Sequence, residues 1–205
     1  MYAYPKSTVA VESPASALSE VPHDRIAKAV RTILSNVGED PEREGLLRTP
    51  ERVARMYDEL LAGYSTSVEE LINGALFEEG SDEPVIVADI EYHSLCEHHM
   101  LPFHGVAHIA YVPNKTVIGL SKIPRIVELF ARRLQVQERM TKQIADLIEE
   151  VLEPRGVAVV QLGHHMCASM RGIKKHGVSM VTRAMRGVYR EDATLRREFT
   201  QQVLG

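Results

Sequence analysis

The spacing of apolar residues divides the chain into helical and extended segments. Apolar residues recur at helical intervals over residues 24–36 and again over residues 49–61. The second segment opens with Thr49 and Pro50, which suit the cap and the first turn of a helix. Gly38 and Gly63 follow the two segments and favour helix ends. The pattern therefore predicts two helices in the N-terminal part of the chain.

Extended segments follow, and they predict a sheet. Strands are expected over residues 85–91, 105–112, 157–162 and 178–188. A polar, His-rich loop over 92–104 separates the first two. After the turn signal Pro113–Asn114, a short strand over 117–120 could pair with the strand before it.

Two consecutive helices are predicted between the strand pairs. Their apolar stripes cover residues 123–134 and 140–151, and the helical phase slips at residues 135–138 between them. The resulting order is helices, two strands, helices, two strands. This order indicates an α+β fold with antiparallel hairpins rather than parallel βαβ units.

Composition places the chain among ordinary globular proteins. Its 205 residues are 44% hydrophobic and 25% charged, and this length allows a core without disulfide bonds. The net charge of -4 disfavours a general nucleic-acid-binding role. No segment approaches the roughly 18 apolar residues of a membrane span, and the N-terminus lacks the features of a signal peptide. We expect a cytoplasmic protein with a disordered tail over residues 1–22.

Histidine and cysteine are concentrated in two clusters. Eight of the nine histidines lie between His93 and His176, together with both cysteines. In the first cluster, Cys96 and His99 can point into one site from a single turn. Cys167, in the second cluster, also follows a predicted strand, so the two sulfurs would meet if those strands were neighbours. Thiolate and imidazole are ligands that zinc prefers, and three of them leave a fourth position for an activated water.

Other interpretations of these clusters stay open at this point. The metal site could be closed by a second histidine, or the cysteines could be ordinary buried thiols. His98 and His165 lie beside the ligands, and histidine is the side-chain type whose ordinary pKa suits proton transfer at neutral pH. Each could equally be a polar residue satisfied by neighbours near the sheet.

Basic residues near predicted helix starts suggest an anion site. Ser121, Lys122 and Arg125 open one predicted helix, whose N-terminus attracts anions. Arg171 follows Cys167, and Arg52 lies near the start of an earlier helix. Converging cations suit a polyphosphate, although each residue taken alone fits a solvated surface equally well.

Glu138 lies at the break between the two central helices. Its carboxylate could accept two hydrogen bonds from guanine, which adenine cannot donate, and Gln137 could support that contact. The alternative is a glutamate that stabilises the dipole at a helix start.

Long segments of the chain resemble GTP cyclohydrolase I from about residue 24 to the C-terminus. The matching segments cover residues 49–54, 96–99, 118–128, 133–139, 165–167 and 170–172. The resemblance implies a tunnelling fold: an antiparallel sheet with helices on one face, an N-terminal helical segment to about residue 80, and a core over 84–205 within a domain over 23–205. It further implies a barrel formed by oligomerisation, a homodecamer of two pentamers, with sites at subunit interfaces.

The resemblance also implies the chemistry and the role of each residue. GTP would be hydrolysed at C8 of guanine, lose formate, and rearrange to 7,8-dihydroneopterin triphosphate, the first step of pterin and tetrahydrofolate biosynthesis in one-carbon metabolism. Zn²⁺ would be the cofactor. The implied roles are zinc binding by Cys96, His99 and Cys167; proton transfer by His98 and His165; ribose contact by Ser121; guanine binding by Glu138 and Gln137; and triphosphate binding by Lys122, Arg125, Arg171 and Arg52.

Some positions depart from the family pattern. Gly163–His164 stands where relatives often carry alanine and an acidic residue, and His164 complicates the choice of the proton-transfer histidine. Arg183 stands in a strand that is often richer in small hydroxyl residues. Two other functions remain as alternatives: a metal-free nitrile reductase of the same fold, and a non-catalytic assembly with structural zinc.

Overall fold

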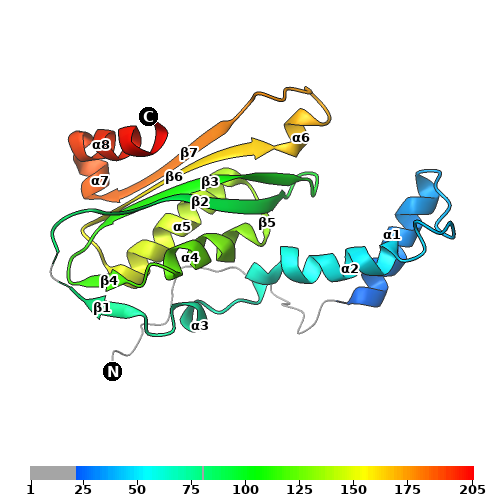
Figure 1. The fold of residues 1–205 in the computed structure, drawn as a ribbon, viewed down its shortest axis with the longest axis horizontal. Helices are drawn as coiled ribbons and strands as arrows, with labels where there is room; N and C mark the ends of the chain where they lie inside the picture. Colours follow the sequence, from blue (N-terminus) through cyan, green and yellow to red (C-terminus); the bar gives the residue numbers. More distant parts are fainter. Residues whose placement is uncertain (1–21, 80) are drawn as a thin grey trace.

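Helices α1 and α2 form an arm that extends away from the sheet (Figure 1). A computed structural model of the protein describes residues 22–79 and 81–205. Helices α1 (His23–Asn36) and α2 (Thr49–Leu60) occupy the two segments with helical apolar spacing and pack against each other. The tail predicted over residues 1–22 lies outside the described residues, apart from Pro22.

A short connection and a two-stranded sheet follow the arm. It comprises η1 (Ala62–Tyr64), α3 (Val68–Ile72) and β1 (Leu76–Glu78), and β1 pairs antiparallel with β4 (Thr116–Ile118). The suggested pairing of the strand at 117–120 with the strand before it is therefore wrong. That strand, β3, already has a hydrogen-bonded neighbour on each side, so no free edge remains for β4.

The main sheet has five strands and is mixed rather than purely antiparallel. Its spatial order is β5 (Leu134–Gln135), β2 (Val85–Cys96), β3 (Pro102–Val112), β6 (Gly156–His165) and β7 (Met180–Gly187). Only the short β5–β2 pair is parallel. The phase slip predicted at residues 135–138 coincides with the passage from β5 into the next helix.

The expected loop over 92–104 is mostly strand. Strand β2 continues to its end at Cys96 and β3 begins at Pro102, which leaves only residues 97–101 between them. The histidines of this region alternate with buried residues: Tyr92 is buried and His93 exposed. Alternation is the pattern of a strand with one face buried, and the many polar side chains obscured it in the sequence.

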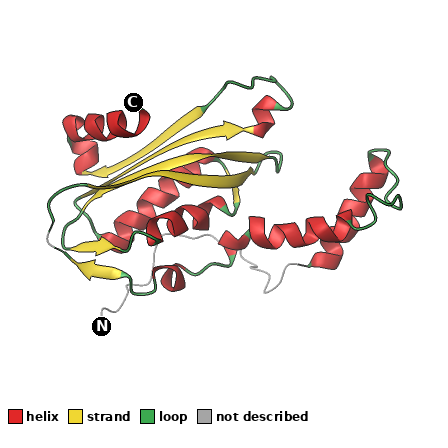
Figure 2. Cartoon of the chain, viewed as in Figure 1, coloured by secondary structure: helices red, strands yellow, loops and turns green. Residues whose placement is uncertain are grey.

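Helices cover both faces of the sheet (Figure 2). Helices α4 (Lys122–Ala131) and α5 (Gln137–Leu152) lie on one face and share its core with residues such as Ile109 and Val159. On the opposite face, α7 (Val188–Glu191) and α8 (Ala193–Leu204) place Tyr189 and Phe199 against Ala158. The expectation of helices on one face is therefore corrected.

Helix α8 was not predicted because its apolar stripe is short, although it has a recognisable start. Asp192 caps it by accepting hydrogen bonds from the backbone N–H groups of Thr194 and Leu195 at 2.7 and 3.2 Å. Within the described residues, none of the helices combines the length and the apolar character that crossing a bilayer requires.

Candidate functional site

The predicted metal ligands meet at one end of the main sheet. Strands β2 and β6 both pair antiparallel with β3, so they run in the same direction and terminate at the same end of the sheet. Cys96 is the last residue of β2, and Cys167 lies in α6 (Met166–Ser169), directly after β6. The ligand atoms of Cys96, His99 and Cys167 all lie within 4.8 Å of one another. The sequence interpretation made the meeting of the two sulfurs conditional on neighbouring strands. In the structure β2 and β6 are not neighbours but flank β3, and the sulfurs still meet.

A tight turn after β2 returns His99 towards Cys96. The carbonyl of Cys96 accepts hydrogen bonds from the backbone N–H groups of His99 at 3.3 Å and Met100 at 2.8 Å. Met100 has a positive φ of 54°, which reverses the chain so that the N–H of Cys96 donates to the carbonyl of Leu101 at 2.9 Å. The backbone of this turn thus fixes the C-x-x-H segment in the shape that a shared ligand site needs.

An ion pair joins the same turn to helix α5. Arg139 donates from both terminal nitrogens to the two oxygens of Glu97, at 2.6 and 2.9 Å. The Arg139 hydrogen bond is the main reason why the pKa of Glu97 is lowered. Bidentate arginine–carboxylate pairs add orientation as well as energy. The sequence interpretation missed this pair, although both residues lie within the segments that resemble the family.

The chemistry of the donor set suits a soft divalent cation. Burial and the nearby Cys96 raise the pKa of the Cys167 thiol, so two thiolates are unfavourable here without a compensating positive charge. Arg171 supplies some of that charge, because it acts to lower the pKa of Cys167, and its Nη1 lies 3.0 Å from Nε2 of His99. Among the described residues, no fourth His, Cys, Asp or Glu joins the group. Two sulfurs and one imidazole fit zinc, at distances of about 2.3 and 2.0–2.1 Å respectively.

The side chain of His165, rather than that of His164, lies on the face of the sheet that α4 and α5 cover. Successive residues of a strand point to opposite faces, and β6 ends with both histidines. The His165 ring stacks on the buried Phe103 with centroids 4.6 Å apart. Its Nε2 lies 2.9 Å from Oε1 of Gln137. Strand geometry thus places the side chain of His165 beside α5 and that of His164 on the opposite face.

The Gln137 contact defines the protonation of His165. An amide oxygen only accepts, so Nε2 of His165 carries the proton and donates it, which leaves Nδ1 as an acceptor. Burial lowers the pKa of His165, while Glu138 acts in the opposite direction and raises it. His165 is therefore held mainly in its neutral form near neutral pH, with one nitrogen ready to accept a proton.

Gln137 itself is fully buried, whereas a side chain that contacts guanine would have to reach the substrate. Its Nε2 donates to the carbonyls of Gln161 and Met180 at 3.2 and 3.0 Å and to Oγ1 of Thr182 at 3.0 Å. With Oε1 facing His165, both ends of the amide have partners inside the protein. The position of Gln137 thus favours orientation of His165 over direct contact with a base.

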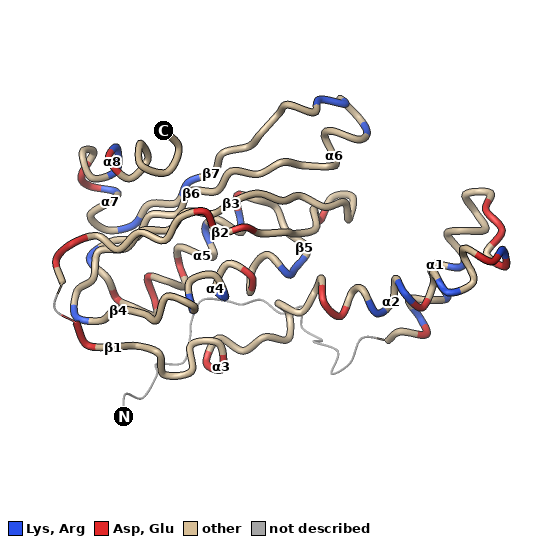
Figure 3. The backbone as a smooth tube through the Cα atoms, in the orientation of Figure 1, with Lys and Arg blue, Asp and Glu red and all other residues tan. Residues whose placement is uncertain are grey.

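Three further predicted residues lie around this cluster. Glu138 is exposed in the first turn of α5 and close enough to raise the pKa of His165. Nδ1 of His98 lies 3.8 Å from Sγ of Cys96. Arg171 is exposed in the loop between α6 and β7. Figure 3 shows Lys and Arg but no acidic residue along this loop, which therefore suits an anion.

The other predicted anion contacts do not join the cluster within one chain. Helix α4 has ten residues and is therefore about 15 Å long. Ser121, Lys122 and Arg125 lie at its start, whereas its end leads into β5, which pairs with Cys96. Arg52 lies on the α1–α2 arm, well separated from α6 in Figure 1.

Lys122, which the family resemblance implies as a phosphate ligand, has a partner inside the chain. It is buried, and its Nζ donates to the carbonyl of Leu71 at 2.8 Å. Arg125 and Arg52, in contrast, are exposed. In this arrangement Arg125 and Arg52 are free to meet a ligand outside the chain, while Lys122 ties α4 to α3.

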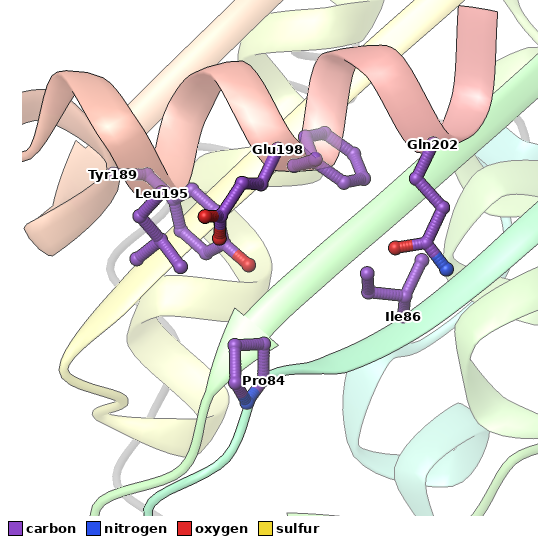
Figure 4. A pocket seen from close by; sticks show the side chains of 7 residues that line it. Pro84, Ile86, Tyr189, Leu195, Glu198 and Gln202 are labelled. Atoms are coloured by element: carbon purple, nitrogen blue, oxygen red, sulfur yellow. The ribbon is translucent and has the colours of Figure 1, made fainter. Parts of the chain in front are cut away.

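A separate hollow of about 340 Å³ lies between α8 and the beginning of β2 (Figure 4). Pro84, Ile86, Tyr189 and Gln202 line it. It contains none of the predicted site residues and lies at the opposite end of β2 from Cys96. The candidate site is therefore the open cluster at the sheet edge rather than this hollow.

Comparison with known proteins identifies the family. The family model for GTP cyclohydrolase I matches residues 26–204. The chain is 55% identical to the GTP cyclohydrolase 1 of Gloeobacter violaceus, with 92% of this chain and 88% of that protein covered. It is 54% identical to that of Leptospira biflexa and 53% to that of Campylobacter jejuni, over 83% of this chain and 93% and 90% of theirs.

A solved structure of the archaeosine synthase QueF-Like in the apo form aligns with a TM-score of 0.45 and 16% identity, over 53% of this chain and 97% of that one. This likeness is too weak to bear on function. The family match, in contrast, spans most of the arm, both central helices and every predicted ligand. The chain belongs to the GTP cyclohydrolase I family.

Proposed function

We propose that this chain is a zinc-dependent GTP cyclohydrolase I, which converts GTP to 7,8-dihydroneopterin triphosphate and releases formate. The convergence of Cys96, His99 and Cys167 beside His165 and Glu138 carries the proposal. The names of the relatives support the same reaction. The product would enter pterin and tetrahydrofolate biosynthesis; a cytoplasmic location and a catalytic domain over residues 23–205 stay predictions.

The three ligands would hold zinc in an open site. Bound there, zinc would supply a Lewis acid that lowers the pKa of a coordinated water and polarises the substrate. The absence of a fourth protein ligand among the described residues supports this open site over a structural one. It also argues against the metal-free reductase, which needs no such ligand set.

The surrounding side chains divide the remaining work. Glu138, exposed at the start of α5, would accept hydrogen bonds from N1–H and the amino group of guanine and orient the ring. Nδ1 of His165 would accept a proton in the hydrolytic steps, and His98 would exchange protons beside Cys96. Arg171 would contact the triphosphate from the α6–β7 loop.

Direct measurement of the product tests the proposal. Purified, zinc-loaded protein is incubated with GTP, the mixture is oxidised, and neopterin fluorescence and released formate are measured. We expect both products in equal amounts, and ATP serves as the control substrate because adenine lacks the donors that Glu138 needs. A zinc-loaded preparation that forms neither product would refute the proposed activity.

We further propose that each site forms between subunits of a homo-oligomer, expected to be a decamer. In one chain, Arg125 lies at the opposite end of α4 from the metal ligands, and Arg52 lies on the extended arm. A second copy could bring the exposed Arg125, Ser121 and Arg52 to the cluster. Closed symmetric assembly repeats such a contact at every interface.

Mixing two inactive variants tests this arrangement. Cys167→Ser lacks a metal ligand and Arg125→Ala lacks a cation, so each should be inactive or nearly so. In co-assembled oligomers, about one quarter of the sites of a two-chain interface would draw both intact residues from different chains. We expect activity to reappear in co-expressed, mixed assemblies, and only there. Recovery no greater than the sum of the separate variants would place both residues in one chain's site.

A third prediction concerns Gln137 as a positioning residue. Gln137→Leu should lower kcat by about 10- to 100-fold because His165 loses the acceptor that fixes its orientation and tautomer. KM for GTP and zinc content should stay near wild type, since the amide is buried away from the solvent. Steady-state kinetics and metal analysis measure this division, with Thr182→Val, which removes only one anchor of Gln137, as the control. A rise in KM at constant kcat would instead support the guanine contact.

A further inference from the structure

Three histidines form a continuous row across the three central strands of the main sheet, near the end of the sheet that carries Cys96. His93 on β2 lies opposite His104 on β3, and His104 lies opposite His164 on β6. The rings of His93 and His104 are stacked with centroids 5.7 Å apart, and those of His104 and His164 are 5.9 Å apart. We name these three residues the histidine row.

The histidine row lies on the opposite face of the sheet from the candidate zinc ligands. His164 immediately precedes His165, which faces α5, so the two side chains point to opposite faces. Likewise, Tyr92 is buried in the helix-covered core while His93 is exposed. Helices α7 and α8 cover only the other end of this face, around Ala158. The row is therefore an exposed feature separate from the catalytic cluster.

The three imidazoles have no other structural role that the described residues reveal. All three are exposed, and within residues 22–79 and 81–205 no hydrogen bond or ion pair engages any of their rings. His108, on the same face of β3, is by contrast buried and accepts a hydrogen bond from the backbone N–H of Asp89. Rings that neither a hydrogen bond nor an ion pair holds can reorient towards a ligand at little energetic cost.

We propose that the histidine row binds a divalent transition-metal ion of the class that prefers imidazole, such as Ni²⁺, Cu²⁺ or Zn²⁺. Side chains directly opposite each other on antiparallel strands have Cβ atoms about 4.5–5.5 Å apart, which lets two imidazoles converge on one ion. Imidazole is a preferred ligand of these ions. His104 belongs to both opposed pairs and is the central ligand. Binding requires the stacked rings to rotate out of the row, which exposed side chains do rapidly.

Nickel titration of the zinc-loaded, full-length protein tests the site. Calorimetry should detect Ni²⁺ binding beyond the resident zinc, at one equivalent per chain. The visible spectrum should lack thiolate-to-nickel charge-transfer absorption, and the zinc content should not fall. A thiolate band, or release of zinc, would show that nickel enters the cysteine cluster and would overturn the proposal.

Substitutions assign the binding to individual residues. His104→Gln should weaken Ni²⁺ binding by more than about 10-fold, and His93→Gln should have a smaller effect because the His104–His164 pair remains. His176→Gln, at an exposed histidine of the α6–β7 loop, is the matched control and should bind as the wild type does. Retained zinc content and circular dichroism show that each variant is folded. Failure to bind nickel in the wild type, or unchanged affinity of His104→Gln, would refute the site.

Discussion

Replacement of Cys167 by serine is expected to remove the bound zinc and to abolish turnover while leaving the assembly intact. Serine is nearly isosteric, but its hydroxyl is a poor ligand for zinc compared with a thiolate. We expect kcat/KM for GTP to fall by on the order of 10³-fold or more, because a metal ion supplies several kcal/mol of transition-state stabilisation. Cys167 lies at the sheet edge and is only partly buried, so the core should tolerate the change.

Metal analysis after gel filtration, combined with the neopterin assay, measures each part of this expectation. Ser169→Ala is the matched control, because it alters the same short helix, where within the described residues the Ser169 hydroxyl donates only to Sδ of Met166. It should retain zinc, activity and oligomer size. A Cys167→Ser variant with wild-type turnover would remove Cys167 from the ligand set, and a variant that dissociates would show instead a structural metal.

Substitution of Glu138 by alanine is expected to weaken GTP binding by about 100-fold without loss of zinc. Each of the two hydrogen bonds to a carboxylate contributes roughly 1.5–3 kcal/mol. The expected loss of affinity lies towards the lower end of their sum, because water partly replaces the lost contacts. Glu138 is exposed at the start of α5 and has no ligand role in the metal cluster. Its removal should therefore leave the zinc in place. Because Glu138 also raises the pKa of His165, the effect on the substrate is measured as binding rather than as turnover.

Equilibrium binding of a non-hydrolysable GTP analogue gives the direct measurement, together with zinc content. Glu149→Ala is the control, because Glu149 is an exposed glutamate on the same helix with only a 3.7 Å contact to Arg186. It should bind GTP as the wild type does. If Glu138→Ala bound the analogue with unchanged affinity, the guanine contact would lie elsewhere, and Gln137 would again become a candidate.

The main elements of the fold were predictable from apolar spacing, and the exceptions have physical causes. Helices α1, α2, α4 and α5 each carry an apolar stripe at helical intervals, and each lies within a few residues of its predicted range. The last part of β2 and the first part of β3 were missed because the exposed face of these segments carries histidines. Strand β5 was missed because a two-residue strand has no period to detect.

The sequence alone determined which residue types the site uses. Local spacing and residue chemistry identified the Cys96 and Cys167 clusters as candidate metal ligands, because metal ligands must be drawn from a few side-chain types. The guanine-binding role of Glu138, in contrast, came only from the resemblance of longer segments to the family. Local spacing also placed Cys96 and His99 in one turn, because the distance between them depends only on the short backbone that joins them.

Only the tertiary structure decided how these clusters come together. It also decided which of the residues predicted to contact the substrate lie away from the cluster within one chain. The register of β3 brings the ends of β2 and β6 to one edge, and strand alternation sends His164 and His165 to opposite faces. The length of α4 keeps Arg125 away from Cys96, and the burial of Gln137 turns it towards His165. These outcomes depend on pairings between residues far apart in the chain, which no local pattern encodes.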